Sequence, residues 1–390
     1  MSEILAAPPL KLAVGRREPP AARETFAVLP TAARPRFLVS LASRRAAAAA
    51  VGDSGYAPEV RVRLAHALGR LGITLGVAPH LFRDRLSISE DDRERDQPLS
   101  DLLLSERLAT IFARRDLTLA VRVGRSRPNR KPLVRVLSHD GTFLGYVKVG
   151  WNELTRELVQ NEARVLAEID RRRSLLTAFE VPRVLYSGKW RHFELLALTP
   201  LRGRAFRMVR RHLDVAAAAM SEIAQFVEVD ERPLRESEYW QRTKTHAETA
   251  SDGPLPSLAR EVEDRFGDEV LTYGFWHGDW APWNLAWRDG RVAVWDWERS
   301  THDAPLGLDA VHFDFQVELT ESRNRSLEAL RRVLAGKTRM SSARELSPER
   351  QPLLLSLHLL EMALRWEEGR RAGMSPVDTI YVPGLEAVLD

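Results

Sequence analysis

The sequence contains no cysteine, little lysine and no long apolar run. The missing cysteine excludes a disulfide scaffold, a cysteine-ligated zinc site, an iron–sulfur cluster and thiol catalysis. No stretch approaches the roughly 18 apolar residues of a membrane span. The N-terminus also lacks the order of basic, apolar and cleavage-site regions that marks a signal peptide. We therefore expect a cytoplasmic protein that has no membrane partner, although the lack of cysteine alone fits any compartment.

Neither basic nor acidic residues are in large excess. The chain has 58 basic and 54 acidic residues and a formal net charge of +4. So small an excess over 390 residues gives no reason to expect a specific nucleic-acid partner. The basic residues include only six lysines, so a lysine in a strand or helix is informative. The length and the 44% hydrophobic content predict two or three domains.

The periodicity of the chain predicts three parts. Residues 1–110 are expected to form an N-terminal extension or accessory subdomain, with a strand at 36–41, a helix at 58–71, a charged linker at 91–96 and a helix that Ser100 caps. Residues 111–200 show strand patterns at 117–124, 133–137, 143–149, 181–186 and 193–198, and a helix pattern at 152–172. Residues 201–390 show helix patterns at 213–229, 237–250, 258–266, 327–335 and 353–368. The predicted class is α+β, with a small β-rich lobe before a larger, mainly helical lobe.

The segment 275–300 carries the residues best suited to catalysis. Its Asp289-Gly290 pair is a strong signal for a two-residue hairpin turn. In that hairpin Asn284 opposes Trp295, and Asp296 is the next residue after Trp295. Asn284 and Asp296 therefore lie at the same open end of the hairpin, offset by one residue. Strict alternation would point the two side chains to opposite faces. At least one of them must therefore lie where its strand bends.

These two side chains offer a carboxylate and an amide oxygen at one place. Such hard oxygen donors suit Mg²⁺, which typically takes one or two protein carboxylates together with phosphate oxygens. Asp279 lies five residues before Asn284, across a loop that Pro282 tightens. It can stand beside the metal without being a ligand.

Together these residues form a recognisable pattern. His277-Gly278-Asp279, then Asn284, then Asp296-Trp297-Glu298 resembles the catalytic and metal loops of the aminoglycoside phosphotransferase and choline kinase group, which has a protein-kinase-like, two-lobe fold. The resemblance implies that Asp279 is the base that orients the acceptor hydroxyl and takes its proton. It implies that Asn284 and Asp296 hold Mg²⁺ against the phosphates of ATP. His277 is then expected to support the loop.

An upstream lysine completes the resemblance. Lys148 ends the predicted strand 143–149, and in this fold such a lysine steadies the nucleotide phosphates and pairs with a glutamate on the next helix. Glu162 shares an i, i+4 face with Leu158 and Leu166 and so faces inward. Glu157 falls elsewhere on the helical wheel. Glu162 is the predicted partner.

Two further nucleotide contacts follow from the resemblance. Gly124 begins the loop that would cover the phosphates, but protein kinases have three glycines where this loop has one. The basic side chains of 121–135 would then replace backbone contacts, or else form a solvated face. Leu196 and Leu198 occupy the place of the interlobe hinge, where adenine would hydrogen-bond to the backbone. Asp309 is expected to buttress the catalytic loop.

Three functions compete. The favoured one is an ATP-dependent phosphotransferase that acts on a hydroxyl of a small molecule such as a sugar, a glycoside or an aminoglycoside-like compound. The second is a metal-dependent hydrolase that uses the local pairs His277/Asp279, His302/Asp303 and His312/Asp314. The third is a catalytically silent kinase-like binding protein, favoured only by the glycine-poor loop.

Residues near the predicted base leave the acceptor and the oligomeric state open. Trp280 and Trp283 could stack on a sugar, but core packing is the stronger expectation for the tryptophans of this segment. An acidic acceptor pocket could use glutamates of the predicted helix 353–368. Glu361, Glu367 and Glu368 alternate there with Arg365, Arg370 and Arg371, a mixture typical of a solvated face.

Overall fold

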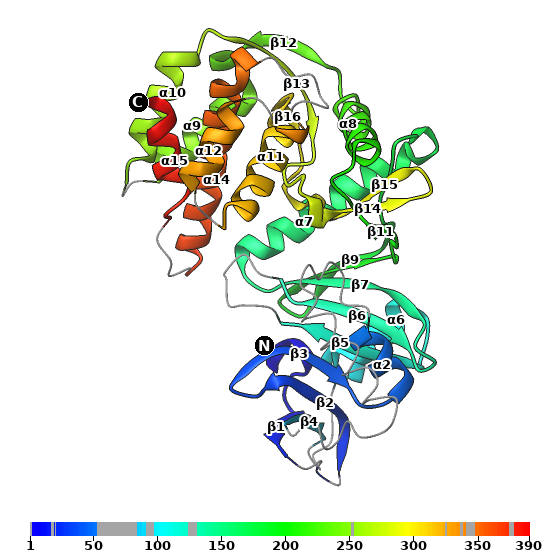
Figure 1. The fold of residues 1–390 in the computed structure, drawn as a ribbon. Coiled ribbons are helices and arrows are strands. Elements are labelled where there is room, and N and C mark those ends of the chain that lie inside the picture. The colour runs from blue at the N-terminus through cyan, green and yellow to red at the C-terminus, as the bar shows by residue number, and fades with distance from the viewer. Residues whose placement is uncertain are drawn as a thin grey trace. The chain divides into compact units, whose positions relative to one another are not determined.

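The computed structural model divides the chain into two compact units (Figure 1). The first contains Met1–Ala163 and Arg183–Pro200, and the second contains Arg164–Pro182 and Leu201–Asp390. The structure describes residues 2–16, 19, 21–52, 84–90, 97–123, 131–250, 253–323, 326–335, 338–340, 348–373 and 378–390. The predicted helix 58–71, the linker 91–96 and the loop that begins at Gly124 lie outside these residues.

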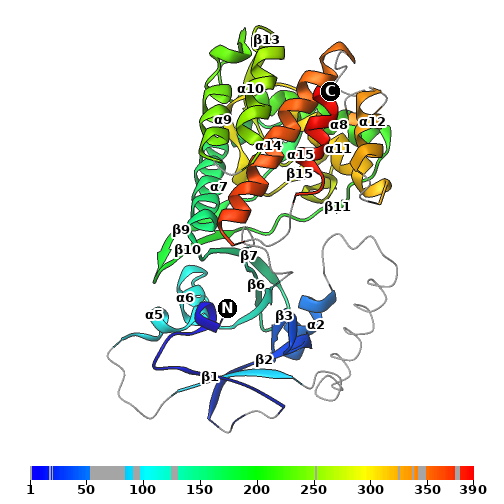
Figure 2. The ribbon, with the colours of Figure 1, turned by 90° about the vertical axis from the view of Figure 1, so that its left-hand side faces the viewer.

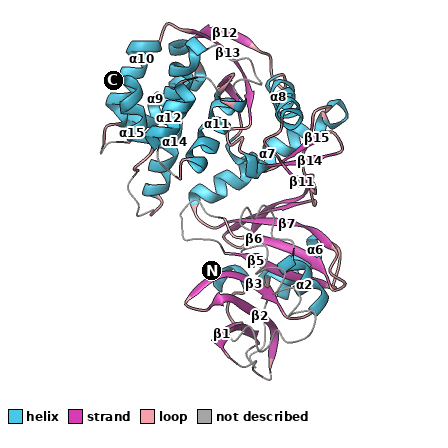
Figure 3. Ribbon diagram, in the orientation of Figure 1, coloured by secondary structure: helices cyan, strands magenta, loops and turns pink. Residues whose placement is uncertain are grey.

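One antiparallel sheet of nine strands organises the described part of the first unit, in the order β1-β4-β2-β3-β5-β6-β7-β10-β9 (Figure 3). The strands are β1 (Lys11–Gly15), β2 (Ala22–Thr31), β3 (Arg34–Ser40), β4 (Arg85–Ser89), β5 (Leu117–Arg122), β6 (Leu133–Ser138), β7 (Phe143–Gly150), β9 (Val184–Trp190) and β10 (Phe193–Leu198). Short helices accompany them: α1 (Ser2–Leu5), α2 (Arg44–Gly52), α5 (Leu99–Leu102) and α6 (Leu104–Ile111). Because β3 pairs with β5, the strands before residue 110 continue the sheet of the strands after it.

Alternation along the strands explains how this sheet presents two faces. In β7, Phe143, Gly145, Val147 and Val149 are buried, whereas Lys148 is half-buried on the opposite face. A period of two side chains per repeat is what the pleat requires. The alternating and β-branched residues in the sequence therefore predicted this strand correctly.

The predicted cap at Ser100 is wrong. Ser100 lies inside α5, which follows Pro98, and Leu103 separates α5 from α6 in an extended conformation. Leu103 also forms an isolated β-bridge with Ala6. The interruption has a packing reason, because the three consecutive leucines 102–104 are all buried, which a continuous helix with a solvated face would not allow.

The second unit is mainly helical. The helix α7 (Glu153–Arg171) leads into it, and α8 (Arg210–Ala224), α9 (Glu238–Thr249), α10 (Leu255–Phe266), α11 (Leu308–Glu321), α12 (Ser326–Leu334), α14 (Gln351–Arg371) and α15 (Tyr381–Leu389) follow. Two small sheets accompany them, with the strand orders β11-β14-β15-β8 and β12-β13-β16. Their strands are β8 (Phe179–Glu180), β11 (Arg204–Ala205), β12 (Asp230–Pro233), β13 (Val270–Trp276), β14 (Leu285–Arg288), β15 (Arg291–Val294) and β16 (Thr301–Pro305).

The helices α9, α10, α14 and α15 lie side by side around an apolar core (Figure 2). The predicted helices of this region are present, and Ser237 caps α9 by accepting a hydrogen bond from the backbone of Trp240. The α+β class, with a β-rich region before a mainly helical one, is confirmed. None of the helices in the described part of the chain has the length and apolar character needed to span a bilayer.

The sequence did not predict α11. Eleven of its residues are buried, so it has no solvated face and its sequence lacks the amphipathic period by which surface helices are found. This helix nevertheless supplies two residues to the candidate site.

Candidate active site

The hairpin of the candidate site has the predicted register. Asp289 and Gly290 form its turn with φ of 47° and 85°. The backbone N–H of Trp295 donates to the carbonyl of Asn284 at 3.3 Å. Asp296 then adopts a left-handed conformation with φ of 73°. The bend that the sequence required lies at Asp296, an aspartate being one of the few residue types that tolerates that conformation.

The loop before the hairpin is held by α11. The Asp309 carboxylate accepts hydrogen bonds from the backbone N–H groups of His277 at 2.8 Å and Gly278 at 2.9 Å. Gly278 has φ of 82°, and a Cβ there would meet the carbonyl oxygen of Arg299 at 2.4 Å. Glycine is therefore required at this position for both conformation and space. The predicted contact of Asp309 with the loop is present.

His277 connects the loop to the hairpin. Its Nδ1 accepts a hydrogen bond from the backbone N–H of Asp279 at 3.1 Å, and its Nε2 contacts the carbonyl oxygen of Trp295 at 3.1 Å. The ring is buried, and this burial lowers its pKa. Since Nδ1 accepts, Nε2 carries the proton and donates. These contacts are those of a supporting residue, as expected.

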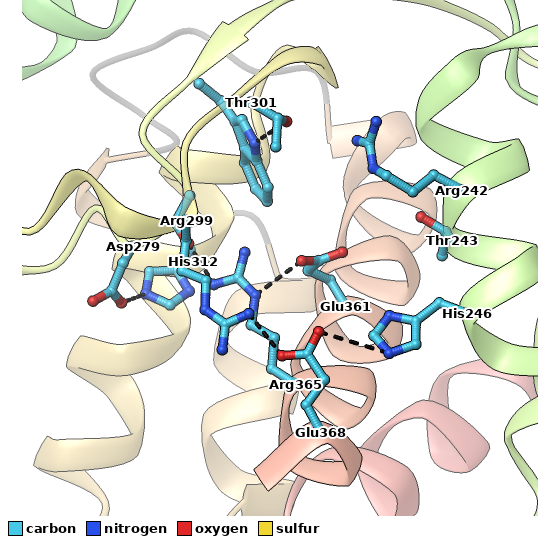
Figure 4. A network of polar contacts seen from close by, with 12 residues as sticks. Arg242, Thr243, His246, Asp279, Arg299, Thr301, His312, Glu361, Arg365 and Glu368 are labelled. Atoms are coloured by element: carbon cyan, nitrogen blue, oxygen red, sulfur yellow. Dashed lines mark hydrogen bonds and ion pairs between the residues drawn. The ribbon is translucent and has the colours of Figure 1, made fainter. Parts of the chain in front are cut away.

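Asp279 has donors at both carboxylate oxygens. Asn284 Nδ2 donates to Oδ2 at 2.8 Å and to the backbone carbonyl of Asp279 at 2.9 Å. His312 Nε2 lies 3.0 Å from Oδ1 (Figure 4). An ionised carboxylate only accepts, so Nε2 is the donor. The side chain of Asp279 is still 32% exposed, which leaves room for a reacting group beside an oriented carboxylate.

The contact between His312 and Asp279 was not predicted. The sequence suggested His312 only as a member of a local pair with Asp314. The helix explains the contact, because Asp309 and His312 are three residues apart in α11 and therefore share a face. The residue that holds the loop and the residue that contacts the carboxylate come from the same helical turn.

The residues expected to hold Mg²⁺ suit that ion. Asn284 uses its Nδ2 group on Asp279, so its Oδ1 atom is directed away from that carboxylate. Asp296 is half-buried in the turn just after the paired strands. An amide oxygen and a carboxylate at the open end of one hairpin form a hard donor set of the kind that Mg²⁺ takes together with phosphate.

The helix α14 contributes a buried cation behind the loop. Arg365 donates from Nη1 to the carbonyl of Gly278 at 2.6 Å and pairs with Glu361 at 2.8 Å (Figure 4). Burial alone would raise the pKa of Glu361, but Arg365 and two further arginines outweigh it and lower that pKa. Glu368 of the same helix pairs with Arg299 at 2.8 Å. The sequence placed these charges on one helix but did not predict the contact of Arg365 with the loop.

In the first unit, the expected ion pair is present. Lys148 Nζ lies 2.5 Å from Glu162 Oε2, Glu162 is fully buried, and the side chain of Lys148 is 12% exposed. Glu157 is exposed. Leu196 of β10 lies opposite Lys148 in the ladder with β7, and both Leu196 and Leu198 are buried. Their contact with a nucleotide stays a prediction, as does that of Gly124.

In the described part of the chain, the three His/Asp pairs of the alternative metal site do not come together at one place. His302 contacts Glu168 at 2.8 Å, whereas the neighbouring Asp303 accepts from the backbone N–H of Tyr239 at 2.7 Å. Asp314 accepts from the Thr338 hydroxyl at 2.6 Å. Although His312 contacts Asp279, the side chains of His302, Asp303 and Asp314 bind other parts of the second unit. None of the described groups of potential ligands combines the three pairs.

Three of the six tryptophans of segment 275–300 belong to the core. Trp280 and Trp297 are fully buried, and Trp276 is 7% exposed. A stacking role for Trp280 is therefore excluded by its burial. Trp283 is 39% exposed and is the one of the two candidates whose ring can be reached from solvent.

Comparison with known proteins finds a family that resembles the central segment of the chain. Residues 147–307 match the model of the phosphotransferase enzyme family. No curated protein matches the chain by sequence. Similar solved structures include a thermostable mutant of the aminoglycoside phosphotransferase APH(4)-Ia, with 15% identity and a TM-score of 0.45 over 73% of this chain and 98% of that one.

Two further solved structures come from named bacteria. The aminoglycoside phosphotransferase of Alicyclobacillus acidocaldarius has 12% identity and a TM-score of 0.35 over 66% of this chain and 83% of that one. APH(3'')-Id of Streptomyces rimosus has 14% identity and a TM-score of 0.37 over 60% of this chain and 88% of that one. The matched segment begins beside Lys148 and ends beyond Asp296. Residues 147–307 of this chain are thus similar to the phosphotransferase enzyme family.

Proposed function

We propose that the protein is an ATP-dependent kinase that transfers the γ-phosphoryl group to a hydroxyl of a small molecule. The observation that carries the proposal is the Asp279 carboxylate, which is oriented by donors at both oxygens within the segment that matches the phosphotransferase family. In the proposed reaction the acceptor oxygen forms a bond to the γ-phosphorus while the bond to the leaving ADP oxygen breaks. The hydroxyl proton passes to Asp279.

The residues of this chain contribute chiefly by positioning. Phosphoryl transfer needs little covalent help from the protein, so orientation and charge stabilisation supply most of the rate enhancement. His312 and Asn284 restrict the rotation of the Asp279 carboxylate, and Asp309 and Arg365 hold the backbone of its loop.

The remaining assignments belong to the same proposal. Asn284 and Asp296 are the residues that would hold Mg²⁺, which when bound neutralises charge on the phosphates. Lys148, fixed by Glu162, would bind the nucleotide phosphates. Leu196 and Leu198 would contact adenine through their backbone, and Gly124 would begin the phosphate-covering loop.

Binding of MgATP tests this proposal without knowledge of the acceptor. A ligand that binds only the folded state raises the melting temperature by mass action. We expect MgATP to raise the Tm of the wild type and to raise that of Asp296→Asn less. The control is Asp289→Asn, which changes an aspartate in the same hairpin that also has positive φ, 47° against 73°, but lies in the exposed turn.

The outcomes separate the kinase from the silent binding protein. A shift that needs Mg²⁺, is weakened in Asp296→Asn and is retained in Asp289→Asn supports the kinase. Absence of a shift at millimolar MgATP contradicts it. Nucleotide binding without ATP consumption across a panel of hydroxylated acceptors would favour the silent binding protein.

A further inference from the structure

We propose that the acceptor is a hydroxylated compound with an anionic group, a carboxylate or a phosphate, and that Arg242 of α9 binds that group. This inference rests on the proposed kinase function and specifies its substrate. It follows from the charges that surround Asp279 in the second unit (Figure 4).

The carboxylates of this region are already neutralised by arginine. Glu361 pairs with Arg365 at 2.8 Å, and Glu368 pairs with Arg299 at 2.8 Å. Glu368 also has His246 at 3.6 Å. A polycationic acceptor would have to displace arginines that are 10% and 16% exposed. Moving a buried cation away from its carboxylate is costly, so this face is poorly suited to polyamines.

Glu367, the third glutamate of α14 in this region, is neutralised in the same way. Its carboxylate contacts Arg370 at 2.6 Å and Arg371 at 3.1 Å. Both guanidiniums lower the pKa of Glu367, and the contact with Arg370 has the largest effect. The acidic side chains that the sequence suggested as an anchor for a cationic drug are thus committed to internal ion pairs.

Arg242 differs from these arginines. It is exposed, and among the described residues it has no carboxylate within ion-pair distance. Its contacts are the backbone carbonyl of Asp303 at 3.3 Å and the ring of Tyr239, whose centroid is 6.0 Å from Cζ. It extends from α9 toward the side where Glu361 lies (Figure 4), and its charge contributes to the lowered pKa of Glu361.

A shallow, open surface of α9 adjoins Arg242. An open pocket of about 450 Å³ is lined by Gln241, Arg242, Thr245, His246 and Thr249. Two hydroxyls, an amide and an imidazole can all bond to a hydroxylated compound. A guanidinium among them offers the fork geometry that matches a carboxylate or phosphate.

Arg242 is connected to the loop of the base through α14. Glu361, whose pKa the charge of Arg242 helps to lower, pairs with Arg365 at 2.8 Å, and Arg365 donates to the carbonyl of Gly278 at 2.6 Å. His246 lines the pocket and contacts Glu368, which pairs with Arg299. In the proposed complex, the acceptor places its hydroxyl at Asp279 and its anionic group at Arg242.

Binding of three matched sugars tests the inference. Glucuronate, glucose and glucosamine have one pyranose frame and differ in charge. Their affinities are measured by titration calorimetry with MgADP present, for the wild type, Arg242→Gln and Arg260→Gln. Arg260 is an exposed arginine of α10 and serves as the control.

We expect glucuronate to bind the wild type and Arg260→Gln at least about tenfold more tightly than the other two sugars, which is the order of one charge-assisted contact. Arg242→Gln should remove that preference. Equal or tighter binding of glucosamine, a glucuronate preference that survives in Arg242→Gln, or no binding of any of the three overturns the inference.

The MgATP shift of the same preparations separates this inference from the kinase proposal. If wild type and Arg242→Gln both show the shift but the glucuronate preference is absent, the acceptor class is wrong and the kinase proposal stands. If the wild type shows no MgATP shift, the kinase proposal itself fails.

Discussion

The two charged centres of the molecule are held in different ways. In the first unit, Lys148 and Glu162 lie on a regular strand and a regular helix, and one close ion pair joins them. In the second unit, Asp279 lies on a loop with a positive-φ glycine and is fixed through Asn284 and His312. A regular strand or helix sets the direction of the side chains it carries. The side chain of a loop residue is oriented only by contacts with several other segments. We expect the two centres to respond differently to mutation.

The largest expected effect is on the chemistry at Asp279. The change Asp279→Asn keeps the shape of the side chain but removes the base, so kcat should fall by about 10³-fold, within the range for a lost general base. The Tm shift with MgATP should be retained. Turnover is measured by ATP consumption with an acceptor found in the hydroxylated panel. Activity within about tenfold of the wild type would contradict the role of base.

The next effect concerns the ion pair of the first unit. Lys148→Met removes the cation that faces the fully buried Glu162 carboxylate, so the free energy of unfolding should fall by about 3 kcal/mol. The double change Lys148→Met/Glu162→Leu should recover part of this loss, because the buried charge is gone. Urea denaturation measures both. If the double variant is less stable than Lys148→Met, the pair does not act as described.

Backbone constraint in the loop of the second unit gives a somewhat smaller effect. Gly278→Ala should destabilise the protein by about 2 kcal/mol more than Gly290→Ala, because crowding adds to the cost of positive φ. The two glycines have nearly equal φ, 82° and 85°, but a Cβ at Gly278 meets the Arg299 carbonyl at 2.4 Å and one at Gly290 meets nothing within 4 Å. Urea denaturation compares the two variants. Equal losses would show that crowding at Gly278 is relieved without cost.

The smallest expected effect is on pH dependence in the second unit. Burial, together with His312 and Arg365, lowers the pKa of His358 well below its usual range. As pH falls through about 6.5, the unfolded chain takes up a proton at this position and the folded protein does not, so stability falls. Between pH 7.5 and 5.5, His358→Phe should therefore lose about 1 kcal/mol less than the wild type.

Denaturation curves at the two pH values measure this difference. His139 is exposed, and His139→Gln serves as the control that removes a histidine from the surface. An unchanged pH dependence in His358→Phe would mean that this imidazole is not buried in the neutral form.

The sequence predicted the elements whose information is local. The Asp289-Gly290 turn requires two consecutive residues with positive φ, a local property of an Asp-Gly pair, and it fixes the register of the hairpin. Glu162 was predicted over Glu157 from the family resemblance together with the helical period, and the structure buries the first and exposes the second. The loop contacts of His277 and Asp309 followed from the family resemblance.

The elements that were missed or wrong depend on packing. The helix α11 is buried on every side, so its sequence carries no period to detect. Ser100 has the residue type of a cap, but the burial of three consecutive leucines interrupts the helix instead. Trp280 stands beside the base in the sequence, but its ring is fully buried.

By itself, the sequence determined the class of fold, the hairpin and the lysine–glutamate pair, because turn chemistry and side-chain period act over a few residues. The candidate base stays a prediction that follows from the family resemblance. Only the tertiary structure decided what surrounds that base. His312 lies 33 positions from Asp279, and Arg365 lies 87 positions from Gly278. Contacts over such separations are set by how α11 and α14 pack, and packing depends on the whole core rather than on any segment.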